Sequence, residues 1–168
     1  MADTMGKKWE AEFKRGWITA FPGHFIYRLP DQVSGYKTTS QNPCDFIAFA
    51  KKKLLMAECK AHAGASLPFS AIRQFDKLIS YIGTPDTFPG VLLWLYEKDL
   101  VLWITADDLK YMRDTEGKKS VGIKALTDPS YNIIQIPAEK KRVFMDVDYN
   151  TLMDRLIELE EKKKWLKT

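Results

Sequence analysis

The chain has 168 residues, of which 45% are hydrophobic and 29% are charged, and its formal net charge is +4 at pH 7. This length and composition predict one globular domain, residues 1–168, with a sizeable core. No run approaches the roughly 18 consecutive apolar residues that span a membrane, and residues 1–8 lack the apolar core of a signal peptide. We therefore expect a cytoplasmic protein without a membrane partner, whose cysteines stay reduced.

The first part of the chain predicts a helix and a short strand. Residues 6–16 favour a helix because Trp9 and Phe13, four positions apart, share one face. Residues 24–29 are apolar and aromatic and predict the first strand. Residues 30–43 are polar and rich in turn formers, so we expect a connection there.

Two hydrophobic strands joined by a lysine turn follow, over residues 43–60. A tight turn at residues 51–52 pairs residues whose numbers sum to 103, which places Asp45 opposite Glu58. Lys60 shares a face with Glu58, because side chains along a strand alternate with a period of two. Both faces of this hairpin are otherwise apolar, so we expect it to be central and covered on both sides.

The convergence of Asp45, Glu58 and Lys60 has an electrostatic cost. Two carboxylates side by side in a partly dry site repel, and one would normally take up a proton. A divalent cation removes this conflict, and hard oxygen ligands suit Mg²⁺ or Mn²⁺. The alternative interpretation is a surface hairpin that carries an Asp–Glu–Lys salt-bridge cluster.

The cysteines raise a second question about metals. Cys59 and His62 have the spacing of a zinc-ligand pair, but the sequence has no second pair that would complete a four-ligand site. We therefore expect Cys44 and Cys59 to be small, buried packing residues.

The middle of the chain predicts a helix and two strands. Ser70 is a plausible N-cap for a helix over residues 71–81, which ends before a glycine and a proline. Residues 91–96 and 100–104 are nearly continuous apolar runs around a charged turn, which is typical of buried strands.

The last part of the chain predicts a short helix, a strand and a long helix. A capping box at Thr105 opens a helix to about residue 112, and a polar, basic loop follows over residues 115–123. Residues 131–136 predict a strand or extended segment. Residues 149–166 form an amphipathic helix that could pack on the sheet or contribute to a dimer interface.

The order Pro-x-Asp, a hairpin and Glu-x-Lys, here Asp45 followed by Glu58-Cys59-Lys60, resembles the PD-(D/E)XK nuclease superfamily. More of the chain resembles one branch, the RecU-type Holliday junction resolvases, also called penicillin-binding-protein-related factor A. The further matching segments are Gly6-Lys7-Lys8-Trp9-Glu10, Ser66-Leu67-Pro68-Phe69 with Gln74, Gly117-Lys118-Lys119-Ser120-Val121, and Val147-Asp148-Tyr149 with Leu152. The resemblance implies an α/β, restriction-endonuclease-like fold with a central mixed β-sheet flanked by helices.

This resemblance implies a magnesium-dependent endonuclease in which Mn²⁺ can replace Mg²⁺. Asp45 and Glu58 would be metal ligands, together with the main-chain carbonyl of Cys59. The reaction would be phosphodiester hydrolysis, in which Lys60 orients the attacking water or stabilises the developing negative charge.

Glu10 and Gln74 are further catalytic candidates by the same resemblance. Glu10 would be an extra acid beside the metal, although it could instead form a helical ion pair with Lys14, and Glu12 is a competing candidate. Gln74, or Arg73 beside it, would hold the scissile phosphate. The alternative for Gln74 is a plain exposed glutamine.

The expected partner is DNA, specifically four-way junctions in recombination and repair, and two symmetric nicks favour a homodimer. Lys7, Lys8, Arg73, Lys118 and Lys119 are candidate DNA contacts, although such lysines are often only solvated. The family's basic stalk corresponds here to residues 30–44, which contain Lys37 as their single base. This departure leaves two alternatives open: a nuclease for other branched or duplex DNA, and a non-catalytic DNA-binding recombination accessory module.

Overall fold

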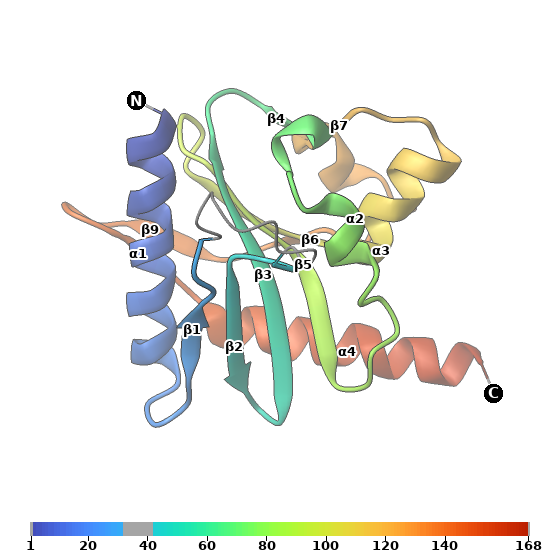
Figure 1. Cartoon of the computed structure of the whole chain (residues 1–168), viewed down its shortest axis with the longest axis horizontal. Coiled ribbons are helices and arrows are strands. Elements are labelled where there is room, and N and C mark those ends of the chain that lie inside the picture. Colours follow the sequence, from blue (N-terminus) through green and yellow to red (C-terminus); the bar gives the residue numbers. More distant parts are fainter. Residues whose placement is uncertain (1, 32–41, 168) are drawn as a thin grey trace.

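The computed structural model describes residues 2–31 and 42–167, which form a central six-stranded sheet with helices around it (Figure 1). The strands lie in the order β1-β2-β3-β5-β6-β8. The β3–β5 pair is parallel and the other neighbouring pairs are antiparallel, so the sheet is mixed, as the resemblance implied. The strands are β1 (Ile26–Arg28), β2 (Phe46–Ala50), β3 (Lys53–His62), β5 (Thr87–Leu95), β6 (Leu100–Thr105) and β8 (Ile134–Gln135).

The β2–β3 hairpin has the predicted register. Phe46 pairs with Ala57 and Ala50 pairs with Lys53, so the residue numbers of each pair sum to 103. The turn residues 51–52 have φ angles of 52° and 63°, the left-handed conformation that a two-residue type I′ turn requires. Asp45, which directly precedes β2, therefore lies at the end of the hairpin that is remote from the lysine turn.

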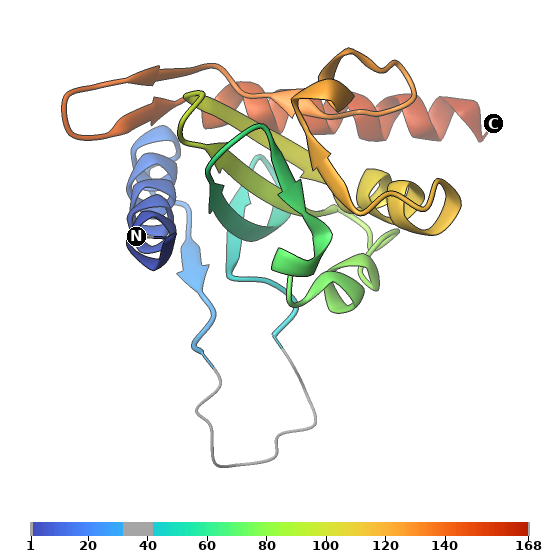
Figure 2. The same ribbon diagram turned by 90° about the horizontal axis from the view of Figure 1, so that it is seen from above.

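Helices cover both faces of the sheet, as Figure 2 shows. α1 (Ala2–Ala20) and α4 (Tyr149–Leu166) contribute to the hydrophobic cluster on one face, and α2 (Phe75–Ile79) and α3 (Ala106–Lys110) contribute to the cluster on the other. The expectation that the hairpin is central and covered on both sides is thus confirmed. None of the helices described is both long and apolar enough to cross a lipid bilayer.

The aromatic face of α1 fixes this helix on the sheet. The predicted helix over residues 6–16 is confirmed and extends further at both ends. Trp9, Phe13 and Trp17 are fully buried, and the Trp9 indole Nε1 donates a hydrogen bond to the Leu92 carbonyl at 3.1 Å. This bond anchors α1 to β5, one residue before Glu10.

Two small sheets were not predicted from the sequence. β9 (Ala138–Lys140) pairs with β10 (Met145–Val147), and β4 (Ser66–Pro68) pairs with β7 (Ser120–Gly122). The Phe69 amide, just after β4, also donates to the main-chain oxygen that precedes β7, at 2.9 Å. Two of the segments that carried the family resemblance therefore lie side by side, although about fifty residues separate them in sequence.

Irregular helical turns connect several of these elements. Residues 69–71 and 123–127 form 3-10 helices, and residues 111–115 form a π-helical turn that continues α3. Thr105 caps α3 as predicted, because its hydroxyl accepts a hydrogen bond from the Asp108 amide at 3.2 Å.

The prediction of a helix over residues 71–81 capped by Ser70 was wrong at its start. The 3-10 turn Phe69–Ala71 ends at Ile72, whose φ of −94° and ψ of 87° are not helical. Ile72 is buried in the hydrophobic cluster of this face, so packing of this side chain overrides the local helical pattern. α2 begins only at Phe75, and Gln74 takes the N-cap position without a side-chain cap bond.

The last helix has the predicted bounds, Tyr149–Leu166, and Asp148 is its N-cap, with its Oδ1 accepting from the Thr151 amide at 3.0 Å. The sequence predicted that this helix either packs on the sheet or contributes to a dimer interface. Packing on the sheet is observed for its first half. Leu152, Met153 and Leu156 are buried in the same cluster as α1.

Candidate active site

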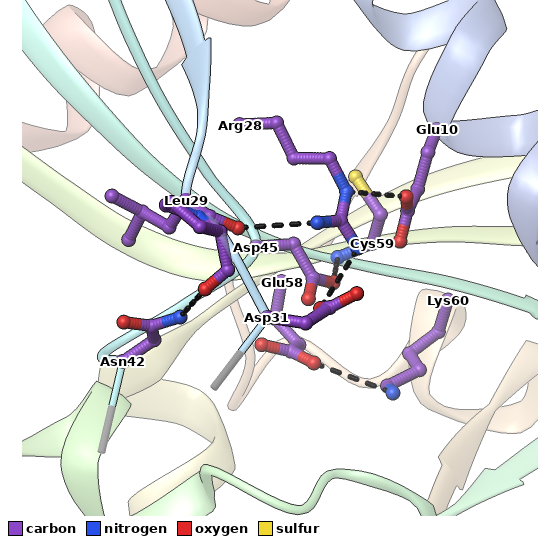
Figure 3. Close-up of polar contacts among 10 residues, drawn as sticks. Glu10, Arg28, Leu29, Asp31, Asn42, Asp45, Glu58, Cys59 and Lys60 are labelled. Carbon is purple, nitrogen blue, oxygen red and sulfur yellow. Dashed lines mark hydrogen bonds and ion pairs between the residues drawn. The ribbon is translucent and has the colours of Figure 1, made fainter. Parts of the chain in front are cut away.

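Asp45 and Glu58 come together at one end of the β2–β3 hairpin (Figure 3). Glu58 is a residue of β3 and is only 3% exposed. The Asp45 carboxylate Oδ2 accepts a hydrogen bond from the Cys59 amide at 2.9 Å. Lys60, two positions along the same face of β3, places its Nζ 3.3 Å from Glu58 Oε1. The predicted convergence of two carboxylates and an ammonium is therefore observed.

The environment of the pair favours a shared proton when no cation is present. Burial, and then the negative charge of Asp45, raise the pKa of Glu58 to about 7, against the opposing effect of Lys60. Burial also raises the pKa of Asp45, which the hydrogen bond from the Cys59 amide and the charge of Lys60 lower in part. A salt-bridge cluster on an open surface would not show this degree of burial, so the alternative of a plain surface hairpin is not supported.

The donors at this site suit a hard divalent cation. Glu58 Oε2 is buried and accepts no hydrogen bond from any residue that the structure describes, so an acceptor is left for a ligand. Within residues 2–31 and 42–167, no group of three or more His, Cys, Asp or Glu side chains could hold a metal ion. A magnesium ion, however, usually takes only one or two protein carboxylates and keeps several waters. Asp45 and Glu58 fit that requirement.

Cys44 and Cys59 are free and buried, as predicted. The side chain of Cys59 belongs to the hydrophobic cluster on the α1 face, whereas Asp45 and Glu58 lie with the opposite face. Burial raises the pKa of the Cys59 thiol well above its usual value. A protonated, buried thiol is a poor ligand, so only the main chain of Cys59 is suited to the role that the resemblance implied.

Glu10 lies at the edge of this site, where α1 meets β1. Its Oε2 accepts from Arg28 Nε at 2.8 Å, so its ion pair is with a strand residue and not with Lys14. Its negative charge contributes to the raised pKa of Asp45. Glu12, the competing candidate, is buried elsewhere and accepts from the Met145 amide at 3.3 Å. Glu10 is therefore the acidic residue of α1 that faces the site.

Arg28 is a site residue that the sequence analysis missed. Besides Glu10, it donates to the Leu29 carbonyl at 3.2 Å and to Asp31 Oδ1 at 3.1 Å. Its positive charge opposes the raised pKa of Asp45. A single arginine at the end of a three-residue strand follows no motif or periodicity, so only the packing of α1 against β1 reveals it.

Gln74 and Arg73 precede α2 on the face of the sheet that carries the carboxylates. Gln74 Oε1 is buried and has no hydrogen-bond partner among the described residues, so the alternative of a plain exposed glutamine is wrong. Arg73 is exposed. Among the described residues, no hydrogen bond or ion pair joins Gln74 or Arg73 to Asp45 or Glu58, so their catalytic role stays a prediction.

The candidate DNA-binding lysines differ in their surroundings. Lys7 and Lys8 are exposed on α1, and Lys8 Nζ lies 5.9 Å from the centre of the Trp94 ring. Lys118 Nζ donates to the hydroxyl of Tyr131, which in turn donates to Glu116. Both lysines are exposed, but Lys118 is already engaged by Tyr131.

No protein-family model matches this chain, and no curated protein matches it in sequence. Among solved structures, it is similar to Hjc, a Holliday junction resolvase from the archaeal hyperthermophile Archaeoglobus fulgidus. The TM-score is 0.52 at 18% sequence identity, and the match covers 71% of this chain and 89% of that chain. This similarity confirms the restriction-endonuclease-like fold, while membership of the RecU-type family stays a prediction. Most of the expected counterpart of the stalk, residues 32–41, lies outside the described residues.

Proposed function

We propose that this protein is a metal-dependent DNA endonuclease that resolves four-way (Holliday) junctions by paired phosphodiester hydrolysis. The observation that carries the proposal is the buried pair Asp45 and Glu58 with Lys60 beside it, set in a restriction-endonuclease-like sheet. The similarity in fold to a protein whose name describes a Holliday junction resolvase supports the choice of substrate. The segments that resemble the RecU-type family point to the same substrate.

The metal in this proposal is Mg²⁺, with Mn²⁺ as a substitute. Asp45, Glu58 and the main-chain carbonyl of Cys59 would hold it. When bound, such a cation supplies Lewis-acid activation of the phosphate and of the attacking water. The raised pKa of Glu58 fits this role, since a cation takes the place of the proton that otherwise relieves the repulsion between the two carboxylates.

The side chains around the pair have separate tasks in the proposed reaction. The Cys59 amide holds the Asp45 carboxylate in one orientation. Lys60 orients the attacking water or stabilises the negative charge that develops on the phosphate. Gln74 holds the scissile phosphate. The DNA backbone then contacts the basic residues of the rim, which are Lys7, Lys8, Arg73, Lys118 and Lys119.

Resolution of a junction requires two symmetric nicks, and a homodimer with twofold symmetry supplies two sites in the required relation. We therefore propose that the active species is a dimer that acts in DNA recombination and repair.

The test is cleavage of end-labelled four-way junction, nicked duplex and linear duplex, each with Mg²⁺ or with EDTA. The wild type is compared with Asp45→Asn and with Asp154→Asn, an exposed residue of α4 that serves as the matched control. Paired nicks in the junction alone, lost with EDTA and with Asp45→Asn but kept with Asp154→Asn, would support the resolvase. Equal cleavage of all three substrates would support the metal site but would show that the enzyme cleaves DNA in general and has no preference for junctions. Tight junction binding without cleavage would favour a non-catalytic accessory module.

A further inference from the structure

Arg28 donates hydrogen bonds to three acceptors at the edge of the carboxylate site (Figure 3). Its Nε donates to Glu10 Oε2 at 2.8 Å, one terminal nitrogen donates to the Leu29 carbonyl at 3.2 Å, and the other donates to Asp31 Oδ1 at 3.1 Å. These acceptors come from α1 and from residues that follow β1. The guanidinium is therefore fixed in direction and lies close enough to Asp45 for its charge to act on that carboxylate.

The two carboxylates that contact Arg28 are not equivalent. The Glu10 side chain is 22% exposed, whereas the Asp31 side chain is 87% exposed and that of Arg28 is 35% exposed. An ion pair with so exposed a carboxylate contributes little stability, because water solvates that carboxylate equally well. The Glu10 contact is thus the more shielded of the two, and the Asp31 contact can be exchanged for another anion.

We propose that Arg28 binds a phosphate of the DNA substrate, that Glu10 is the positioning residue that holds Arg28 for this purpose, and that Asp31 occupies the place of that phosphate when DNA is absent. This inference rests on the proposed nuclease function. It differs from the role that the family resemblance implied for Glu10, which was an acid beside the metal.

The chemistry of the guanidinium favours this assignment. Its planar fork matches the geometry of phosphate oxygens, and its charge does not depend on pH in the physiological range. The hydrogen bond to Glu10 raises the pKa of Arg28 further. Glu10 Oε2 is already engaged by this bond, so that oxygen is committed to Arg28. A phosphate held by Arg28 would lie beside Asp45, where the proposed reaction takes place.

The first experiment measures the affinity for four-way junction DNA in EDTA, where binding is separated from cleavage, over a series of salt concentrations. Arg28→Ala should weaken binding about tenfold and reduce the slope of log K against log salt by about 1, the change expected when one phosphate contact is lost. Arg28→Lys should keep the slope and lose part of the affinity, because lysine retains the charge but not the fork. Arg155→Ala, an exposed arginine of α4, is the matched control and should change neither quantity.

The two carboxylates should have opposite effects in the same assay. Asp31→Asn should tighten binding by a few-fold, because it removes the competing anion. Glu10→Gln should weaken binding in the wild-type background and have no further effect in the Arg28→Ala background, since a positioning residue acts only through its partner. Additive effects of the two substitutions would overturn the assignment of Glu10.

The second experiment titrates Mn²⁺ into the protein without DNA and follows the heat of binding. Glu10→Gln should leave the Mn²⁺ affinity unchanged, because Glu10 acts on Arg28 and not on the metal, whereas Asp45→Asn should abolish binding. A loss of Mn²⁺ affinity in Glu10→Gln, with or without Arg28, would show that Glu10 is a metal ligand and would overturn the inference. Circular dichroism confirms that each variant is folded, and Arg28→Lys and Asp31→Asn keep the test decisive if Arg28→Ala does not fold.

The role of Arg28 in phosphate binding and the proposed nuclease function can fail separately in these experiments. A wild type that cleaves DNA, combined with unchanged affinity and salt slope in Arg28→Ala, would overturn the inference alone. A wild type that neither binds nor cleaves any DNA would overturn the proposed function, and the inference with it.

Discussion

Lys60 Nζ lies 3.3 Å from Glu58 Oε1, and the two side chains share one face of β3 because they are two positions apart. Glu58 is buried, while Lys60 is partly accessible. The ammonium can therefore reach a substrate that approaches the carboxylate pair from solvent.

Replacement of Lys60 by methionine should lower kcat for junction cleavage about 100-fold, the usual effect of removing one group that stabilises developing charge. The affinity for DNA in EDTA should change little, because one lysine among several basic residues contributes little to binding. Single-turnover cleavage and fluorescence anisotropy measure the two quantities. Lys110→Met, an exposed lysine of α3, is the control. Unchanged kcat in Lys60→Met would exclude a role for Lys60 in the chemical step.

The raised pKa of Glu58 predicts how stability depends on pH. Between about 4.5 and about 7 the folded protein holds a proton that the unfolded chain has released, so the free energy of unfolding falls as pH rises through this range. The loss should be on the order of 3 kcal/mol. Glu58→Gln should show a flatter dependence and should be more stable than the wild type above pH 7. Urea denaturation in EDTA at several pH values measures this, with the exposed Glu158→Gln as the control.

Metal addition provides a linked prediction. Above pH 7, Mg²⁺ in place of EDTA should raise the melting temperature of the wild type, because a ligand that binds only the folded state stabilises it. The same addition should not change the melting temperature of Glu58→Gln. Equal shifts in both proteins would mean that Mg²⁺ binds away from the carboxylate pair.

Gly90 is buried in β5, where a Cβ atom would lie 2.5 Å from the Trp103 ring and 2.6 Å from the Ile104 carbonyl. Gly90→Ala should therefore lower the free energy of unfolding by about 2 kcal/mol through overpacking. Gly6→Ala is the matched control, because a Cβ at this position in α1 meets nothing within 4 Å. It should stabilise the protein by about 0.5–1 kcal/mol, the difference in helix propensity between the two residues. Equal effects of the two substitutions in urea denaturation would contradict this account.

Glu160 and Asp154 both lie on α4 and pair with lysines of the β2–β3 hairpin. Lys53 Nζ lies 2.8 Å from Glu160 and 2.6 Å from Asp86, in a partly buried setting, whereas the Lys51–Asp154 pair is more exposed. Glu160→Gln should cost about 1 kcal/mol of stability, and Asp154→Asn should cost less than about 0.5 kcal/mol. The comparison of melting temperatures at low and high salt tests this ranking, since screening should weaken the exposed pair more.

The sequence by itself determined the features that depend on local patterns. The tight turn at Lys51 and Lys52 specified the register of the hairpin, and with it the approach of Asp45 to Glu58. Because a two-residue turn fixes which residues lie opposite each other, this register follows from the position of the two lysines. The bounds of α4 followed from its apolar periodicity, whereas the structure revealed its N-cap, Asp148.

Only the tertiary structure decided the features that depend on contacts between distant segments. The pairing of β4 with β7 and the ion pair of Glu10 with Arg28 join residues that no periodicity relates. The late start of α2 has the same origin, since burial of Ile72 against the sheet overrides a helical pattern that is correct locally. Periodicity and capping act over a few residues along the chain, whereas these contacts depend on how the helices and strands pack together.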